Sequence, residues 1–172
     1  MQRLYSQLIG LSIVVCEESR KLGRVTDLII DPDRACLVAL VTFGKKVIAP
    51  IDINPFKGNF WEVKTHDVLI NPAELVRLNS ISKSRRKLIH KQVVTKSGLA
   101  LGHVADYVMD METLSLVQIY VVKGFLFWAA EKRLIEWKSI LEITDRAIIV
   151  KDHCVSAPAA LKRIVPAKTP AN

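Results

Sequence analysis

The sequence predicts an all-β protein made of two small β-barrels in tandem, because one strand-and-turn pattern occurs in it twice. Residues 22–31 read LGRVTDLIID, and 79 positions later (101 minus 22) residues 101–110 read LGHVADYVMD. Aligned without a gap, residues 22–43 and 101–122 share seven identical positions. A long period seen twice indicates a duplicated small domain, since a solenoid needs at least about three repeats to bury a continuous core.

The length and composition fit this organisation. A chain of 172 residues, of which 50% are hydrophobic, is long enough for two small cores and argues against extended disorder. No apolar run approaches the ~20 residues that a membrane-spanning helix needs. We expect one barrel over residues 1–80 and a second over residues 81–155. A loose tail rich in Ala, Pro and Lys follows at 156–172.

Short β-prone runs separated by turn residues predict the strands of the first barrel. They lie at 11–15, 25–30, 37–43, from 47 onward, 60–63 and 67–70. Asp31 and Pro32 open a tight turn between the second and third runs. Pro50 cannot donate to a ladder, so the fourth strand should end there. A short helix over 71–78, with Pro72 near its start, would close this barrel.

The second barrel repeats the plan with a longer hairpin. Its strands are expected at 88–95, 101–110, 116–122 and 147–150, the last as a counterpart of 67–70. The hairpin at 123–133 replaces the short loop at 44–46, and Trp137 stands where Pro50 stood. Gly23 and Gly102 each begin the second strand of their copy, where a glycine usually marks a bulge or a bend.

The N-terminal segment 8–16 has two interpretations. It resembles the apolar part of a secretion signal that ends in a lipidated cysteine, Cys16. It also matches residues 88–95 of the second copy, and Val15 is larger than the residue that usually precedes such a cysteine. We therefore interpret it as a strand and expect a cytoplasmic protein, peripheral to the inner membrane if it contacts lipid.

The pattern Leu-Gly-x-Val-x-Asp-x-x-x-Asp, followed by a Leu-Val strand and Val-Ile-x-Pro-Ile-x-x-Ile, resembles the PRC-barrel family. The three parts fall at 22–31, at 37–38 and at 47–53, and the second copy departs from the pattern at Trp137 and in its longer hairpin. The resemblance implies two barrels of about 80 residues like the cytoplasmic domain of the photosynthetic reaction-centre H subunit and the C-terminal barrel of a ribosome-maturation factor. It also implies a bacterial or archaeal docking module with no catalytic residues and no cofactor.

Four repeated aspartates invite a catalytic or metal-binding interpretation, but a structural one fits them better. Asp27, Asp31, Asp106 and Asp110 sit beside strand glycines and turns, where a carboxylate accepts hydrogen bonds from backbone donors. We assign them, with Gly23 and Gly102, to the turns of the barrels. The four histidines and three cysteines are scattered without ligand spacing, so we expect no metal site, no disulfide and no enzyme activity.

Two segments are candidates for partner binding. Phe125, Leu126, Phe127 and Trp128 form an aromatic run that strand alternation would divide between two faces. One face would then bind a protein partner or a membrane surface, or would pack on the first barrel or on a second copy in a homodimer.

The second segment is the basic connector, where six cations occur over residues 83–96 with no acid. The residues with phosphate-binding potential there are Lys83, Arg85, Arg86, Lys87 and Lys91. Their phosphate would belong to RNA or to anionic lipid, and the alternative is a solvated linker. The sequence therefore favours a non-catalytic adaptor that docks a protein partner, and an RNA- or ribosome-associated factor comes second.

Overall fold

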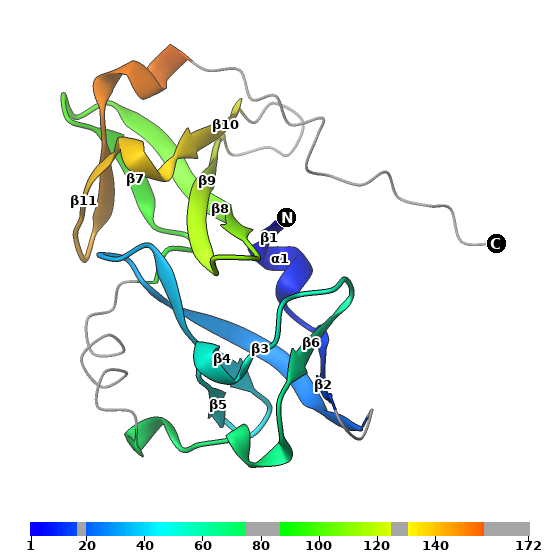
Figure 1. Ribbon diagram of the computed structural model, residues 1–172. Coiled ribbons are helices and arrows are strands. Elements are labelled where there is room, and N and C mark those ends of the chain that lie inside the picture. Colours follow the sequence, from blue (N-terminus) through cyan, green and yellow to red (C-terminus); the bar gives the residue numbers. More distant parts are fainter. Residues whose placement is uncertain (17–19, 75–86, 125–130, 157–172) are drawn as a thin grey trace.

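The structure, a computed structural model, describes residues 1–16, 20–74, 87–124 and 131–156, and the all-β prediction is confirmed (Figure 1). The first half contains these strands, one α-helix and 3-10 turns: β1 (Gln2–Leu4), α1 (Tyr5–Leu8), β2 (Ser12–Val15), β3 (Lys21–Asp31), β4 (Cys36–Thr42), β5 (Val47–Ile48), η1 (Pro50–Asp52), β6 (Phe60–Val63), η2 (His66–Val68) and η3 (Pro72–Glu74).

The second half has the same plan without a counterpart of α1 among its described residues. Its elements are β7 (Gln92–Thr95), β8 (Ala100–Asp110), β9 (Ser115–Lys123), β10 (Glu131–Glu136), η4 (Trp137–Ser139), β11 (Ile140–Ile143), β12 (Ala147–Val150) and η5 (Asp152–Ser156). Trp137 begins a 3-10 turn at the place where Pro50 begins one in the first half, so the predicted equivalence of these two residues is confirmed.

The two halves share their strand order around a central first strand. β2 pairs antiparallel with β3 and parallel with β6, and β7 pairs antiparallel with β8 and parallel with β12. β12 therefore corresponds to β6, and the predicted equivalence of 147–150 with 67–70 is wrong. The segment 67–70 is not a strand, because η2 turns the chain there and Ile70 makes only an isolated bridge to Val47.

Alternation of apolar side chains explains why these segments form barrels. In β2, Ile13 and Val15 are buried while their neighbours are half-buried, and β12 repeats the pattern with Ile148 and Val150. Bulges in β3 and β8 shift this alternation, and bulges are the usual device that curls a sheet toward closure. Buried apolar residues of both halves belong to one connected core.

The halves meet at the tips of their equivalent hairpins. Cys36 of β4 pairs with Ser115 of β9, and each occupies the same position in its own copy (115 minus 36 is 79). The Leu37 amide donates to the Leu114 carbonyl at 2.8 Å, and the Leu116 amide donates to the Ala35 carbonyl at 2.7 Å. Equivalent residues thus exchange equivalent bonds, which is the pairing rule of a two-fold interface.

The N-terminus crosses from the first half to the second. β1 pairs antiparallel with β8, with Arg3 opposite Met109, and α1 follows at the junction of the halves (Figure 1). Leu8 at the end of α1 is fully buried in the shared core. The first strand of the chain therefore belongs to the sheet of the second barrel, a crossing that the sequence did not indicate.

Several predicted features lie wholly or partly outside the described residues. Of the predicted helix at 71–78, the structure describes the 3-10 turn Pro72–Glu74. Three parts of the chain lie outside the described ranges: residues 75–86, which include the start of the basic connector, residues 125–130, which include the aromatic run, and the tail from residue 157. Within those ranges, no helix has the length and apolar character that crossing a bilayer demands.

Candidate functional site

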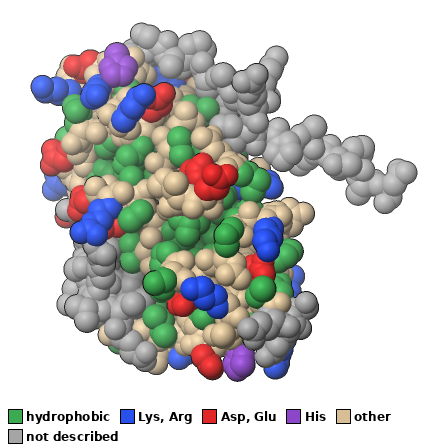
Figure 2. Space-filling model, in the orientation of Figure 1, with side chains coloured by type: hydrophobic (Ala, Val, Ile, Leu, Met, Phe, Trp, Pro, Cys, Tyr) green, Lys and Arg blue, Asp and Glu red, His purple; other side chains and the backbone are tan. Residues whose placement is uncertain are grey.

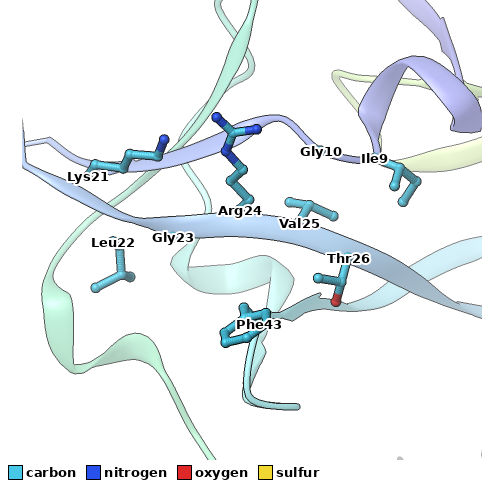
Figure 3. A pocket seen from close by; sticks show the side chains of 9 residues that line it. All are labelled: Ile9, Gly10, Lys21, Leu22, Gly23, Arg24, Val25, Thr26 and Phe43. Atoms are coloured by element: carbon cyan, nitrogen blue, oxygen red, sulfur yellow. The ribbon is translucent and has the colours of Figure 1, made fainter.

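A groove of about 690 Å³ runs along the N-terminal part of β3 in the first half (Figure 3). Its lining is mostly apolar carbon and comes from β3, from the link between α1 and β2, and from the turn after β4: Ile9, Gly10, Lys21, Leu22, Gly23, Arg24, Val25, Thr26 and Phe43. The Phe43 ring is 87% exposed, which is unusual for an aromatic side chain that follows a core strand. An exposed aromatic side chain beside an apolar groove is typical of a docking surface.

The groove exists because β4 ends early. At Thr42 the chain enters a tight turn. The Thr42 amide donates to the Lys46 carbonyl at 2.8 Å, and the Lys45 amide donates to the Thr42 carbonyl at 3.1 Å. Gly44 and Lys45 hold this turn with φ of 84° and 62°. The ladder between β3 and β4 therefore begins at Val25 opposite Thr42, and residues 21–24 of β3 extend beyond it.

In the second half the equivalent place is filled. β9 continues to Lys123, so its ladder with β8 includes His103 opposite Val122. A Cβ built on Gly102 would overlap the Val122 carbonyl, whose carbon would lie 2.6 Å away, and Gly102 has φ of +124°. A Cβ on Gly23 would meet no described atom within 4 Å. The same strand glycine is thus covered by the chain in one copy and open in the other.

The groove has an apolar floor and a cationic rim. Lys21 and Arg24 are exposed and point to one side of β3, while Leu22 points to the other side, where Phe43 lies (Figure 3). The nine residues that line the groove include no Asp, Glu, His or Cys. This set of side chains can bind an apolar ligand with negative charge, because its cations line an otherwise mostly apolar surface.

The predicted turn aspartates fall into two pairs with different surroundings. Asp27 and Asp106 flank the crossing N-terminal segment: Tyr5 Oη donates to Asp27 at 2.8 Å, and the Ser6 amide and hydroxyl both donate to Asp106. Each carboxylate also accepts the next amide of its own strand at 2.8 Å. Burial, and then the bond to Asp27, raises the pKa of Tyr5, so this hydroxyl stays a donor.

Asp31 and Asp110 cap the two hairpin turns in the same way. Asp31 accepts the amides of Asp33 and Arg34 at 2.9 and 3.2 Å, and Asp110 accepts the two equivalent amides at 2.9 and 3.1 Å. The amides of Thr113 and Glu112 lower the pKa of Asp110. With these bonds the carboxylates serve the turns, and among the described residues no His, Cys, Asp and Glu side chains gather into a metal-binding group.

Of the predicted phosphate ligands, Lys87 and Lys91 are described. Lys87 is exposed, with its ammonium 3.7 Å from Asp27. Lys91 is only 7% exposed and donates to the Thr144 carbonyl at 2.7 Å, so its ammonium serves the fold and is not a surface cation. Lys83, Arg85 and Arg86 lie outside the described residues, as do Phe125, Leu126, Phe127 and Trp128.

A small polar pocket of about 430 Å³ lies beside the connector. Its lining is rich in nitrogen: Lys87, Ile89, His90, Lys91, Gln92, His103, Asp145 and Arg146. His103 and Arg146 are exposed and were not among the predicted ligands, because both lie outside the basic stretch 83–96. Strand pairing brings His103 opposite Gln92.

On the face shown in Figure 2, apolar side chains reach the surface over both halves, with cations and anions interspersed among them.

The sequence analysis missed the residues of the groove for a different reason from those of the pocket. Phe43 ends an apolar run that reads as a buried strand, and the sequence signal that it is exposed is the Gly44-Lys45-Lys46 turn directly after it.

All three cysteines lie within the described ranges, and none of them is disulfide-bonded. Cys16 is exposed, Cys36 is half-buried at the junction of the halves, and Cys154 is buried.

Comparison with known proteins agrees with the repeat. No curated protein matches the chain. The PRC-barrel domain matches twice, over residues 1–74 and over residues 82–153. PRC barrels are in general a non-catalytic domain type, often found in protein-interaction and assembly roles. Because the two matches cover most of the chain and coincide with the two halves of the structure, this protein belongs to the PRC-barrel family and carries its domain in tandem.

Proposed function

We propose that this protein is a non-catalytic adaptor that docks a protein partner, with the groove beside β3 as a docking surface. The observation that carries the proposal is Phe43, 87% exposed at the edge of a groove with an apolar floor. Burying such a ring on a partner is favourable by about 2 kcal/mol, so an exposed aromatic side chain in a folded protein is a natural anchor.

The aromatic run 125–128 remains a second predicted surface, and the cytoplasmic membrane remains a predicted location for the complex. Both belong to this proposal. Lys123 and Lys132 flank the run in the sequence and would favour anionic lipid. A homodimer formed through the same apolar side chains is a further prediction.

The test is affinity purification of the tagged full-length chain from its own cell, with quantification of the proteins that co-purify. We expect Phe43→Ser to remove a specific partner while the unfolding midpoint stays unchanged. Leu99→Ser is the matched control, because Leu99 is 47% exposed in the other half and lies outside the groove.

The double variant Phe127→Ser, Trp128→Ser tests the second surface in the same experiment. Flotation with vesicles of neutral or anionic lipid separates a membrane contact from a protein contact. If both surface variants retain every co-purifying protein, the docking proposal is wrong.

The second candidate function is association with RNA or the ribosome, favoured by the pocket that collects Lys87, His90 and Arg146. Cations that contact phosphate release counterions, so such binding must weaken steeply with salt. A filter-binding titration of the full chain with RNA at several salt concentrations tests it. A flat salt response, or equal binding by Arg146→Ala, would exclude this pocket as a phosphate site.

A further inference from the structure

Resting on the docking role proposed above, we infer that the groove receives an extended segment of the partner as an added β-strand. The segment pairs with the free edge of β3 and places acidic side chains beside Lys21 and Arg24. Its apolar side chains lie against Phe43. Strand addition of this kind takes affinity from main-chain hydrogen bonds and specificity from alternate side chains.

The first argument is the direction of the main-chain groups of β3. The Val25 amide donates to the Leu11 carbonyl at 3.0 Å, and the Val25 carbonyl accepts from Gly10 at 2.8 Å, both on the β2 side. Successive residues of a strand direct these groups to opposite sides, so those of Arg24 face the other edge. The ladder with β4 begins only at Val25, and Arg24 has no described strand partner there. An open edge of this kind is a template for another strand.

The second argument is that the other half of the molecule shows what fits this edge. There, His103 stands at the position of Arg24, and it pairs antiparallel with Val122 of β9. The second barrel therefore occupies the start of the equivalent edge with an extended strand of its own chain, one residue pair further than the ladder of the first barrel. The first barrel has no such strand because the turn after Thr42 takes the chain away.

The third argument is Gly23 itself. Its φ lies outside the left-handed region, and a Cβ there would meet no described atom within 4 Å, so neither backbone conformation nor packing of the described chain requires glycine. A glycine inside a strand often marks close approach of another backbone. In the second half Gly102 has that role under the Val122 carbonyl.

The fourth argument is charge. Lys21 and Arg24 line the groove with no acid among the lining residues, and Lys45 is exposed in the turn after Phe43. A partner segment with acidic residues alternating with apolar ones complements this rim and floor. The free edge covers Lys21–Arg24, which at about 3.3 Å per residue admits a core of about four partner residues.

The experiment begins with a displayed library of random twelve-residue peptides selected on the full-length protein. We expect the enriched peptides to alternate apolar and acidic residues and to bind less tightly as salt rises. Two synthetic versions of one enriched peptide are then made, one N-methylated at the odd residues and the other at the even residues. Their affinities show which peptide amides donate main-chain hydrogen bonds to β3. Methylation in one register should weaken binding at least about tenfold, and methylation in the other register should not.

Gly23→Ala is the matching change in the protein. We expect it to leave the unfolding midpoint in place and to weaken binding of the unmethylated peptide at least about tenfold, because the new methyl group takes up space that a closely approaching backbone needs. Leu99→Ser serves as the control that should bind like the unaltered protein. Hydrogen exchange gives a second readout, with the Arg24 amide protected only when peptide is bound.

Failure to enrich any peptide, enrichment without acidic residues, or indifference to both N-methyl registers would overturn strand addition. These outcomes are separable from failure of the docking role. If Phe43→Ser still removes the co-purifying partner, docking stands and only its mode is wrong. If Phe43→Ser changes neither peptide binding nor co-purification, the groove is not a binding surface.

Discussion

The two halves of this protein build the same barrel but treat one strand edge in opposite ways. In the second half β9 continues to Lys123, one residue beyond the pair of His103 with Val122. Its backbone covers Gly102, and Leu101 is buried. In the first half the chain turns at Thr42, Gly23 stays uncovered, and Leu22 is only half-buried. The length of one hairpin connection therefore decides whether the same sequence motif forms core or surface. A duplicated domain can gain a binding edge in this way without any change in its strands.

The largest effect that this comparison predicts is the difference in stability between the variants Gly102→Ala and Gly23→Ala. Gly102 has φ of +124°, and a Cβ would overlap the Val122 carbonyl, so we expect Gly102→Ala to lower the free energy of unfolding by about 3 kcal/mol. Gly23 has neither constraint, and its substitution should change stability by less than about 1 kcal/mol, in the stabilising direction if anything. Urea denaturation of both variants measures the difference.

Equal losses for the two variants would contradict the comparison, because they would mean that Gly23 is also covered in the folded protein. A variant Val122→Ala serves as a control, since it keeps the carbonyl that Gly102 approaches and removes only side-chain atoms. We expect Val122→Ala to cost less than Gly102→Ala.

The second test concerns the crossing N-terminal segment, which binds the two equivalent aspartates unequally. Asp106 is 7% exposed and accepts two bonds from Ser6 and one from Tyr107. Asp27 is more exposed and accepts one bond from Tyr5 and one from Leu28. We expect Asp106→Ala to lower the free energy of unfolding by about 2 kcal/mol and Asp27→Ala by about 1 kcal/mol. Each substitution leaves hydrogen-bond donors without an acceptor, and this costs more where the donors are more deeply buried.

Thermal unfolding of the two variants measures the order of these losses. Tyr5→Phe is the matched control for Asp27→Ala, because it removes the hydroxyl that donates to Asp27 and keeps the ring. The centroid of that ring lies 4.8 Å from the ring centroid of Tyr107. A larger loss for Asp27→Ala than for Asp106→Ala would contradict the assigned geometry.

Much of the fold could be predicted because its signals are local. The turn at Asp31 and the end of β5 before Pro50 each follow from the residues at that position, and the equivalence of Trp137 with Pro50 follows from the repeat. The pairing of β1 with β8 could not be predicted, because three residues at a chain end carry no pattern that distinguishes one sheet from another. The segment 67–70 was mistaken for a strand because an apolar run of this length also suits a turn that packs on a core.

The candidate site was harder to predict than the fold for a related reason. Phe43 and Leu22 look like core residues, and only the position of the turn after Thr42 exposes them. Lys91 looks like a surface cation in a basic stretch, but its ammonium lies under the Thr144 carbonyl. Exposure depends on which strand continues beside which, and that is a long-range property. The repeated motif therefore identified the family, whereas charge and hydrophobicity along the chain did not identify the exposed surface.

The smallest expected effect concerns the hairpin turns, where Asp31 and Asp110 accept equivalent backbone bonds. The amides of Thr113 and Glu112 lower the pKa of Asp110 below its ordinary value of 3.8. A carboxyl whose pKa is lower in the folded protein stabilises the fold above pH 3.8, and this contribution is lost as the pH falls through the lower folded value.

We therefore expect Asp110→Asn to lose stability relative to the unaltered protein at neutral pH and to converge with it as the pH falls through the lowered folded pKa of Asp110. Because the side chain is 26% exposed, the difference should be a few tenths of a kcal/mol, reduced further by salt. Urea denaturation at a series of pH values measures it. A stability difference that stays constant from neutral to acid pH would mean that the amide side chain fails the turn for reasons other than charge, since asparagine retains the acceptor oxygen that both backbone donors use.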